Sequence, residues 1–477
     1  MKKILKVIFF IISFVLIFFS IQKIFTPYNT RIKRWYSFYK IPKDNLDIIF
    51  LGSSHSYATY YPEMIDNRLK INSFNMSSNS QCIDQLYFNL KEILKYQKPK
   101  IVFVELFSLA WDSREHIGDW FIYDNLDGQK FSLNKINSVL TYRKKDNRID
   151  TLFPLVRSHQ DWKEKDKLLE NVYNKIKDKN SLKTFSGFEK IKSEMNEEIT
   201  QNYINEAKTD YKNFYISDFN KEYLEKIKKL SEKYNFKVIY LYSPMYRDFI
   251  NSNYLNKNKK FKEIADLYAD DLLDFNLIGK NINMSERWFE NGYIGHQHTS
   301  FYGAKKITEY LINYLEKNYT FENRENEKYW KLKNENVKNI GYEQKIYGYF
   351  ELLPNVKIKE IMFTQEKKNY GMIEIRFTKD SDISEIKKYN LKIHALPKDK
   401  EEKKLLKHGY QNWDIGNLQK NLKYEREYFY INRNIDPQLN DYVLNLAFYQ
   451  TTRDKNNKVI SYPNFGKQLY TGFEIKK

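Results

Sequence analysis

Two short apolar runs separated by a helix-like stretch constrain the fold of this chain more than any other feature. The runs are Leu46–Gly52 and Ile101–Leu106, and each has the length and continuous apolarity of a strand buried on both faces. Between them, Gln81–Gln97 has apolar residues at helical spacing, and Pro99 ends that helix. A strand, a helix and a strand in this order predict a parallel sheet, to which Ile71–Met76 adds another strand.

The same alternation returns later in the chain. An amphipathic stretch before residue 235 predicts a helix, Lys237–Pro244 predicts a buried strand, and Ala304–Tyr319 predicts the closing helix. The polar, helix-prone residues from Ser108 to Phe219 lie between the two halves, and we interpret them as an insertion over the strand ends. We therefore expect a three-layer α/β domain over residues 29–320, with the insertion at about 108–219.

The remaining third of the chain has a different composition. The chain has 477 residues, more than one hydrophobic core holds, so two domains are expected. After a charged stretch near residue 325, segments such as "VKIKEIMFTQ", "YGMIEIRFT" and "YVLNLAFYQTT" are aromatic-rich and partly alternating, with turn residues between them. This pattern predicts a β-rich, sandwich-like accessory domain over residues 321–477.

The first residues form a membrane anchor in our interpretation. Lys2 and Lys3 precede an apolar run from Val7 to Ile21, and no small-residue cleavage site follows it. An uncleaved, single-pass anchor over residues 1–28 fits this pattern. More basic residues follow the run than precede it, but large domains translocate largely regardless of charge, so we expect the body outside the cytoplasm.

Charge and cysteine content narrow the function classes. The formal net charge is +19, which favours an anionic partner, but the lysines lie in runs mixed with acidic residues, which is typical of solvated helix faces. We therefore do not expect nucleic acid to be the partner. Cys82 is the one cysteine, which excludes an intramolecular disulfide and a site with several cysteine ligands.

A polar stretch directly after the first predicted strand contains the candidate nucleophile. It reads "FLGSSHSY", and its Ser54 follows Gly52 at the carboxyl edge of a parallel sheet, where open α/β folds place their sites. A serine attacks an acyl carbon only when a base accepts its proton. His298 lies just before the closing helix, in a loop that returns to the same edge, and it is the candidate base.

On these residues the chain resembles the SGNH/GDSL hydrolase superfamily, particularly its membrane-anchored DltD-like branch, which handles acyl groups on cell-envelope polymers. Gly52, Ser53 and Ser54 match the first sequence block of that family, and His298 and Gly303 keep the spacing of the last block. The resemblance covers about residues 46 to 319 and implies a flavodoxin-like fold.

The resemblance also implies roles and partners. Ser54 would be the nucleophile and His298 the general base, with the Ser54 amide and the Ser78–Asn79 loop as oxyanion donors. It implies no metal and no organic cofactor. The expected substrate is an O-acylated envelope glycan or teichoic-acid-like polymer, and a membrane-bound O-acyltransferase that presents the acyl donor is an expected partner.

The chain departs from the family pattern at three positions. Gly295 stands where the family has the acid that orients the base, so Glu290 or a backbone carbonyl must take that role. Asn79 replaces a glycine, and Asn tolerates the left-handed conformation better than most residues. Glu105 lies near the position of a family asparagine, and an ionised carboxylate cannot donate a hydrogen bond.

Other histidines and one tryptophan have alternative interpretations. His296 and His298 are two residues apart and could ligate zinc, but no cysteine or third histidine lies nearby, so no metal site is predicted. His55 is interpreted as a structural neighbour of the serine loop rather than a second base, and His55 and Glu105 are also candidate substrate-binding residues. His159 and Trp162 either line an acceptor groove or belong to a packed helix surface.

A second function class also fits the sequence. In this alternative the chain is a non-catalytic binding or scaffold protein for an envelope polysaccharide, and the missing acid and asparagine reflect lost chemistry. Reaction of the serine with a fluorophosphonate probe separates this alternative from an enzyme.

Overall fold

The structure is a computed structural model of the chain. It describes residues 2–477 apart from 112–117, 160–162, 196–206, 292–296, 335–338, 368–369, 398–410, 436–441, 450–451, 454–458, 462–467 and 475–477. The chain divides into two compact units. The first comprises Met1–Glu194, Thr200–Met284 and Trp288–Lys333, and the second comprises Met195–Ile199, Ser285–Arg287 and Asn334–Lys477.

The first unit is built on a parallel sheet, which confirms the predicted α/β class. Its strands are β1 (Ile48–Leu51), β2 (Ser73–Asn75), β3 (Ile101–Glu105), β4 (Lys237–Tyr242) and β5 (Asp271–Asp274). Their order is β2-β1-β3-β4-β5, and every neighbouring pair is parallel. This is the strand order of flavodoxin-like sheets, in which sites lie at the carboxyl edge near β1 and β3. Sequence patterns predicted four of these strands and missed β5.

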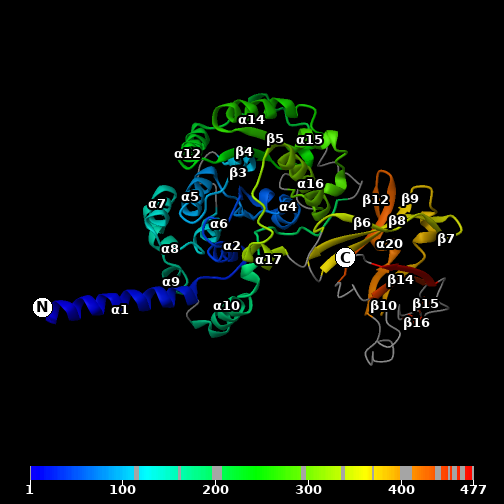
Figure 1. The fold of residues 1–477 in the computed structure, drawn as a ribbon, viewed down its shortest axis with the longest axis horizontal. Helices are drawn as coiled ribbons and strands as arrows, with labels where there is room; N and C mark the ends of the chain where they lie inside the picture. Colours follow the sequence, from blue (N-terminus) through cyan, green and yellow to red (C-terminus); the bar gives the residue numbers. More distant parts are fainter. Residues whose placement is uncertain are drawn as a thin grey trace. The chain divides into compact units, whose positions relative to one another are not determined.

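Helices cover both faces of the sheet because the buried strands are apolar on both sides (Figure 1). The helices are α3 (Ser54–Thr59), α4 (Pro62–Leu69), α5 (Ile83–Ile93), α12 (Asp218–Tyr234), α13 (Tyr246–Ile250), α14 (Tyr254–Tyr268), α15 (Phe275–Asn281) and α16 (Phe301–Asn318). Helix α12 contacts α5 and α14 on one face, and α16 contacts α3 and α4 on the other. Successive side chains of β1 point alternately toward the helices on one face and toward those on the other.

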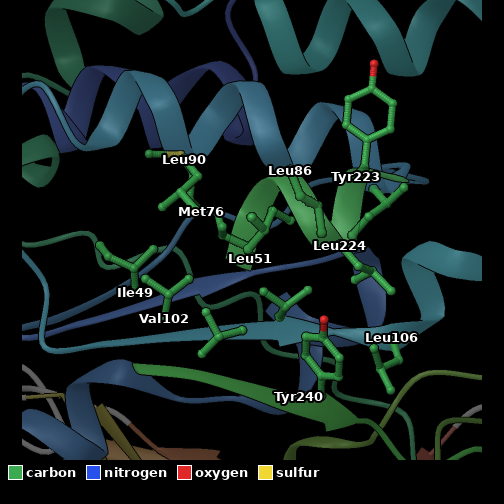
Figure 2. Packing of buried hydrophobic residues seen from close by; sticks show 14 of the residues in the cluster. Ile49, Leu51, Met76, Leu86, Leu90, Val102, Leu106, Tyr223, Leu224 and Tyr240 are labelled. Carbon is green, nitrogen blue, oxygen red and sulfur yellow. The ribbon is translucent and has the colours of Figure 1, made fainter. Parts of the chain in front are cut away.

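Figure 2 shows the core between the sheet and the first helical layer, where Leu86 and Leu90 of α5 and Leu224 of α12 pack over Ile49 and Val102. All five side chains are completely buried. Phe50, between Ile49 and Leu51 in β1, points to the opposite face and stacks between the rings of Phe103 and Tyr60, at centroid distances of 4.8 and 5.4 Å. Burial on both faces fixes the register of β1 and therefore the position of the loop that follows it.

The insertion is helical, as its composition predicts, and it packs beside the first two helices of the chain. These are α1 (Lys2–Phe25) and α2 (Thr30–Phe38), and the insertion contributes α6 (Asp119–Leu126), α7 (Leu133–Tyr142), α8 (Arg148–Leu152), α9 (Pro154–Arg157) and α10 (Lys165–Lys177). By length and composition α1 is able to cross a membrane. It contacts α9 and α10, and α2 contacts α6.

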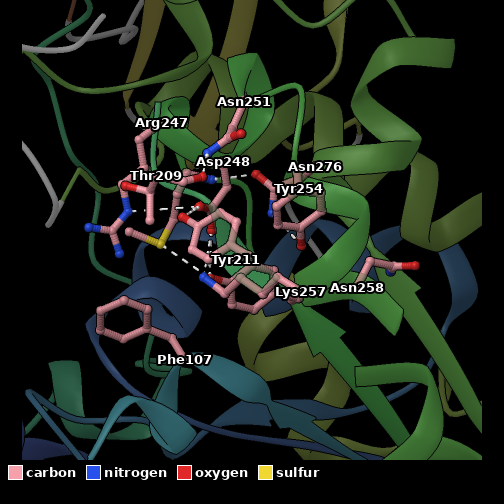
Figure 3. A network of polar contacts seen from close by, with 12 residues as sticks. Phe107, Thr209, Tyr211, Arg247, Asp248, Asn251, Tyr254, Lys257, Asn258 and Asn276 are labelled. Atoms are coloured by element: carbon pink, nitrogen blue, oxygen red, sulfur yellow. Dashed lines mark hydrogen bonds and ion pairs between the residues drawn. The ribbon is translucent and has the colours of Figure 1, made fainter. Parts of the chain in front are cut away.

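A buried polar network holds the end of the insertion to the sheet (Figure 3). Lys257 Nζ contacts Asp248 Oδ2 at 2.8 Å and donates to the Tyr242 hydroxyl at 2.7 Å. The Tyr211 hydroxyl, which belongs to the returning insertion, also donates to Asp248. Burial lowers the pKa of Lys257, and the Asp248 carboxylate opposes that effect. A buried ion pair with further hydrogen-bond partners specifies one arrangement of these segments.

The α/β unit continues beyond the predicted boundary at residue 320. In this stretch α17 (Lys328–Asn334) brings Lys333 within 2.6 Å of the Asp66 carboxylate, and both side chains are buried. Arg324 forms a two-point ion pair with Asp47, with distances of 2.6 and 2.9 Å. The first unit therefore extends to Lys333.

The second unit contains antiparallel sheets, which confirms the prediction of a β-rich C-terminal region. Strands β11 (Gln411–Asn417), β10 (Asn390–Pro397), β14 (Tyr442–Tyr449) and β17 (Gln468–Glu474) form one sheet. Strands β12 (Lys423–Glu425), β13 (Tyr428–Ile435), β9 (Tyr370–Thr378), β8 (Val356–Lys367) and β6 (Glu343–Tyr347) form another, in which β7 (Phe350–Leu353) also pairs with β8. A short ladder joins β15 (Thr452–Arg453) and β16 (Val459–Ser461). Leu391 of β10 lies in the same hydrophobic cluster as Ile375 and Ile431 of the second sheet.

Candidate active site

Gly52 allows the chain to turn sharply between β1 and α3. A Cβ atom at this position would lie 2.5 Å from Glu105 Cβ and 2.8 Å from Ser56 Cβ, so no other residue fits without displacing its neighbours. The next residue, Ser53, is the N-cap of α3, and Ser54 is the first residue of the helix. The parallel register of β1 against β3 brings this turn beside the end of β3, where Glu105 lies.

The two adjacent serines have different environments. The Ser53 hydroxyl donates to Glu105 Oε2 at 2.9 Å and accepts from the His55 amide at 3.3 Å, and it is completely buried. Burial raises the pKa of Glu105 to about 7, although the Phe107 amide and the Ser53 hydroxyl donate to it. The Ser54 side chain is partly exposed and makes no hydrogen bond to any residue that the structure describes. Ser54 is therefore the serine whose hydroxyl is available for chemistry.

Glu290 holds the ring of His298. The Glu290 carboxylate oxygen Oε1 lies 2.5 Å from His298 Nδ1 and accepts from the His298 backbone amide at 2.9 Å. The backbone adds an antiparallel bridge, since the Glu290 amide donates to the His298 carbonyl at 2.9 Å. Burial alone raises the pKa of Glu290, but the hydrogen bonds from His298 outweigh that effect and lower the pKa. A lowered pKa keeps this carboxylate ionised at neutral pH.

The other ring nitrogen of His298, Nε2, is buried and has no hydrogen-bond partner among the described residues. The His298 ring lies 4.9 Å from the ring of His55 and 6.5 Å from the ring of Tyr57, so it faces the first turns of α3. Ser54 and His298 do not form a hydrogen bond in this structure.

In the loop after β2 the Ser78 backbone amide is engaged, whereas the Ser78 hydroxyl and the Asn79 donors have no partner among the described residues. The Ser78 amide already donates to the Gly52 carbonyl at 3.2 Å. The Asn79 side-chain oxygen accepts from the Tyr57 hydroxyl at 2.6 Å and from Arg31 at 3.2 Å, which fixes the amide so that its NH₂ group faces elsewhere. Neither the NH₂ group nor the backbone amide of Asn79 donates to any residue of the described chain.

Arg31 and Arg34 of α2 surround Tyr57 and were not anticipated from the sequence. The Arg34 guanidinium lies over the Tyr57 ring at 4.6 Å, and it forms an ion pair with Glu189 of the insertion. Arg31 donates to the Tyr57 hydroxyl at 3.1 Å and lies 3.5 Å from Glu189. In the sequence these arginines are visible only as basic residues after the apolar run. Their partners lie 23 to 158 positions away in the numbering, and no local pattern encodes such contacts.

Of the other candidate residues, His55 lies within this cluster, His159 lies on the surface, and the rest lie outside the described residues. His55 is buried and lies between the Phe107 and His298 rings, with a centroid distance of 4.0 Å to Phe107. His159 is exposed next to α9, and its ring contacts the Val156 carbonyl, so the structure does not bring it to Ser54. Trp162, Gly295 and His296 lie outside the described residues. Within the described part of the chain, no three histidine, cysteine or acidic side chains are grouped as metal ligands.

Comparisons with known proteins add little. No protein-family model and no curated protein matches the chain. Among solved structures, the chain is similar to BT4096, described as a gut microbial diltiazem-metabolizing enzyme, at 11% identity with 79% of this chain and 72% of that chain covered. The TM-score is 0.20, so nothing about fold or function is inferred from that similarity.

These residues include the types of group that acyl-transfer chemistry uses. The Ser54 hydroxyl and the Asn79 NH₂ group have no partner among the described residues, and the His298 imidazole is held by Glu290 through Nδ1. His298 and Asn79 both lie beside Tyr57 of α3. This combination supplies a nucleophile, a base with an orienting acid, and donors for a developing oxyanion.

Proposed function

We propose that this protein is a serine-dependent O-acyltransferase or O-acylesterase. The observation that carries the proposal is the state of His298, whose Nδ1 contacts the Glu290 carboxylate at 2.5 Å while its buried Nε2 has no described partner. A histidine held in this way has the tautomer and orientation of a general base.

The proposed reaction has two steps. His298 Nε2 accepts the Ser54 proton as Ser54 Oγ forms a bond to the acyl carbon, and the ester bond breaks with the proton passing to the departing alcohol. The Ser54 and Asn79 donors stabilise the negative oxygen of the tetrahedral intermediate. In the second step His298 removes a proton from water or from an acceptor hydroxyl as its oxygen attacks the acyl carbon. The bond from the acyl carbon to Ser54 Oγ then breaks, and His298 returns the proton to Ser54 Oγ. Glu290 stabilises the imidazolium in both steps.

The family proposal follows from the same elements. A parallel sheet in the order β2-β1-β3-β4-β5, a serine shortly after β1 and a histidine shortly before α16 support the resemblance to SGNH hydrolases. The orienting carboxylate in this chain is Glu290, eight residues before the base, instead of an acid at Gly295.

The substrate proposal rests on the apolar helix α1. An anchored enzyme whose body lies outside the cytoplasm meets O-acylated envelope glycans or teichoic-acid-like polymers, and a membrane-bound O-acyltransferase is the proposed source of acyl groups. A net charge of +19 suits an anionic polymer of this kind.

A fluorophosphonate probe tests the proposal directly. The full chain in detergent should be labelled on Ser54, as identified by mass spectrometry of the labelled peptide. The Ser54→Ala variant should lose labelling, while Ser252→Ala, a change at an exposed serine, should keep it. Absence of labelling in the folded wild-type chain would contradict the enzyme and favour the non-catalytic polymer-binding alternative.

A further inference from the structure

The part of the apolar helix α1 that precedes its first contacts with the body is shorter than a bilayer is thick. With Ile4 and Leu5 counted before Lys6, the apolar part of α1 begins at Ile4, and the first ring contacts with the body are made by Phe18 and Phe19. The residues from Ile4 to Ile17 rise roughly 21 Å at 1.5 Å per residue, whereas the hydrocarbon core of a bilayer is about 30 Å thick. A bilayer that holds α1 therefore extends about 9 Å beyond the first contacts with the body.

Two aromatic residues of the insertion lie at the level of Phe18 and Phe19, where α1 first contacts the body. Phe153 meets Phe18 at a centroid distance of 5.5 Å, Phe131 meets Phe19 at 5.2 Å, and the rings of Phe131 and Phe153 stack on each other at 5.8 Å. Helices α9 and α10 of the insertion lie beside the last turns of α1 (Figure 1). Because the rings contact α1 inside its apolar run, they must lie within the leaflet when α1 spans it.

Helix α10 is fixed to the carboxyl end of α1 by hydrogen bonds. Asn171 donates to the carbonyls of Ile24 and Thr26 at 2.9 Å, and Lys175 donates to those of Lys23 and Thr26 at 2.6 Å. These carbonyls at the end of a helix have no partners within the helix itself. Helix α10 therefore lies where the apolar run of α1 ends, at the level of the lipid headgroups.

The opposite side of α10 presents an apolar stripe. Leu169, Tyr173 and Ile176 are spaced by four and three residues, so they share one face of the helix, and they are 67%, 61% and 67% exposed. Asn171 and Lys175 lie on roughly the other side. Four lysines against two acidic residues give α10 a positive charge, which suits anionic headgroups. Further exposed apolar side chains lie on the neighbouring helices, namely Leu133, Leu140, Ile149 and Val156.

We propose that helices α7 to α10 form a membrane-seated collar around α1, with phospholipid acyl chains covering the α10 stripe. The inference rests on α1 as a membrane span, as in the proposed function. Seating by about 5–10 Å is the usual depth of interfacial helices and agrees with the 9 Å difference in length. Helix α2 follows α1 directly, and its Arg31 donates a hydrogen bond to Asn79 of the candidate site. The collar therefore holds the candidate active site at a fixed height over the leaflet. The substrate would be a polymer segment close to its membrane anchor.

Fluorescence quenching by lipids tests this proposal on the full chain. Single cysteines labelled with bimane are introduced as Tyr173→Cys or Ile176→Cys, and Cys82 does not compete because it is completely buried. The chain is reconstituted in vesicles of equal parts phosphatidylcholine and phosphatidylglycerol, with or without bromine on the acyl chains. Ile12→Cys in α1 is the positive control, and Leu255→Cys, which is 63% exposed on α14, is the negative control.

We expect brominated lipids to remove most of the fluorescence at positions 173 and 176, as at position 12, and to leave position 255 unchanged. Quenching at position 12 alone overturns the collar but leaves the span and the enzyme proposal intact. Absence of quenching at position 12 overturns the span, and the collar with it. A label at position 173 that neither brominated lipid nor aqueous iodide quenches is covered by protein, and it overturns the lipid proposal in favour of a second copy or partner. Labelling of Ser54 by the fluorophosphonate probe in the same vesicles reports separately on the proposed function.

Discussion

Replacing Glu290 by glutamine removes the negative charge that faces the imidazolium of His298 while keeping the shape of the side chain. The Glu290 and His298 side chains are only 17% and 22% exposed, so water screens their interaction weakly. In a serine triad, loss of the acid's charge with retained geometry reduces kcat by about 10⁴-fold, because the base is then held in the wrong tautomer. At about 1.36 kcal/mol for each factor of ten, this corresponds to about 5 kcal/mol of transition-state stabilisation. We expect Glu290→Gln to approach that loss.

The assay is hydrolysis of 4-nitrophenyl acetate by the full chain in detergent, with kcat and KM measured separately. Glu222→Gln on α12 is the matched control, since Glu222 is exposed and lies in a helical ion pair with Lys226, and it should keep wild-type activity. Thermal unfolding shows whether each variant is folded. A folded Glu290→Gln variant within a factor of about ten of wild type would refute the role of this carboxylate, because about 1.4 kcal/mol is too small for an orienting acid.

Three further predictions concern the support of the site and the fold. Tyr57→Phe keeps the ring beside His298 but removes the donor to Asn79, so kcat in the ester assay should fall about tenfold with KM unchanged, the effect of one hydrogen bond. Burial raises the pKa of Glu105 to about 7, so the folded state binds the Glu105 proton more tightly than the unfolded state does. The free energy of unfolding should therefore fall by about 3 kcal/mol as pH rises from about 4.5 to 7, and then level off. Urea unfolding across this range should show the slope in wild type and a flatter profile in Glu105→Gln. Lys333→Met leaves the buried Asp66 carboxylate unpaired and should reduce the free energy of unfolding by about 3–5 kcal/mol, with partial recovery when Asp66→Asn is added.

The sequence was sufficient to predict the framework of the candidate site. The apolar run of β1 followed by Gly52 places Ser54 at the carboxyl edge of the sheet, and the amphipathic helix α16 places His298 in the loop before it. These signals are local, because burial on both faces of a strand and on one face of a helix leaves a periodic trace in the residues themselves. Proximity in sequence makes Glu290 a candidate acid, but only the folded chain shows that its carboxylate contacts His298 Nδ1.

Strand β5 shows why periodicity misses some elements. It has four residues, two of which are aspartates, and it lies at the edge of the sheet, so half of it is not buried. Without a continuous apolar run, the segment Asp271–Asp274 resembles a loop. Its pairing with β4 provides the partners that its composition does not indicate.

What the sequence determined by itself is the order of elements, the apolar helix α1, the insertion and the β-rich C-terminal region, because each depends on the residues within one segment. Only the tertiary structure decided that Arg31 donates to Asn79, that the Ser78 amide donates to the Gly52 carbonyl, and that Lys333 pairs with Asp66 in the first unit. These contacts join residues that are far apart in the chain or on different segments. The stabilising free energy of these contacts comes from charges and donors that meet only after the hydrophobic core has brought the segments together. No local sequence pattern therefore predicts them.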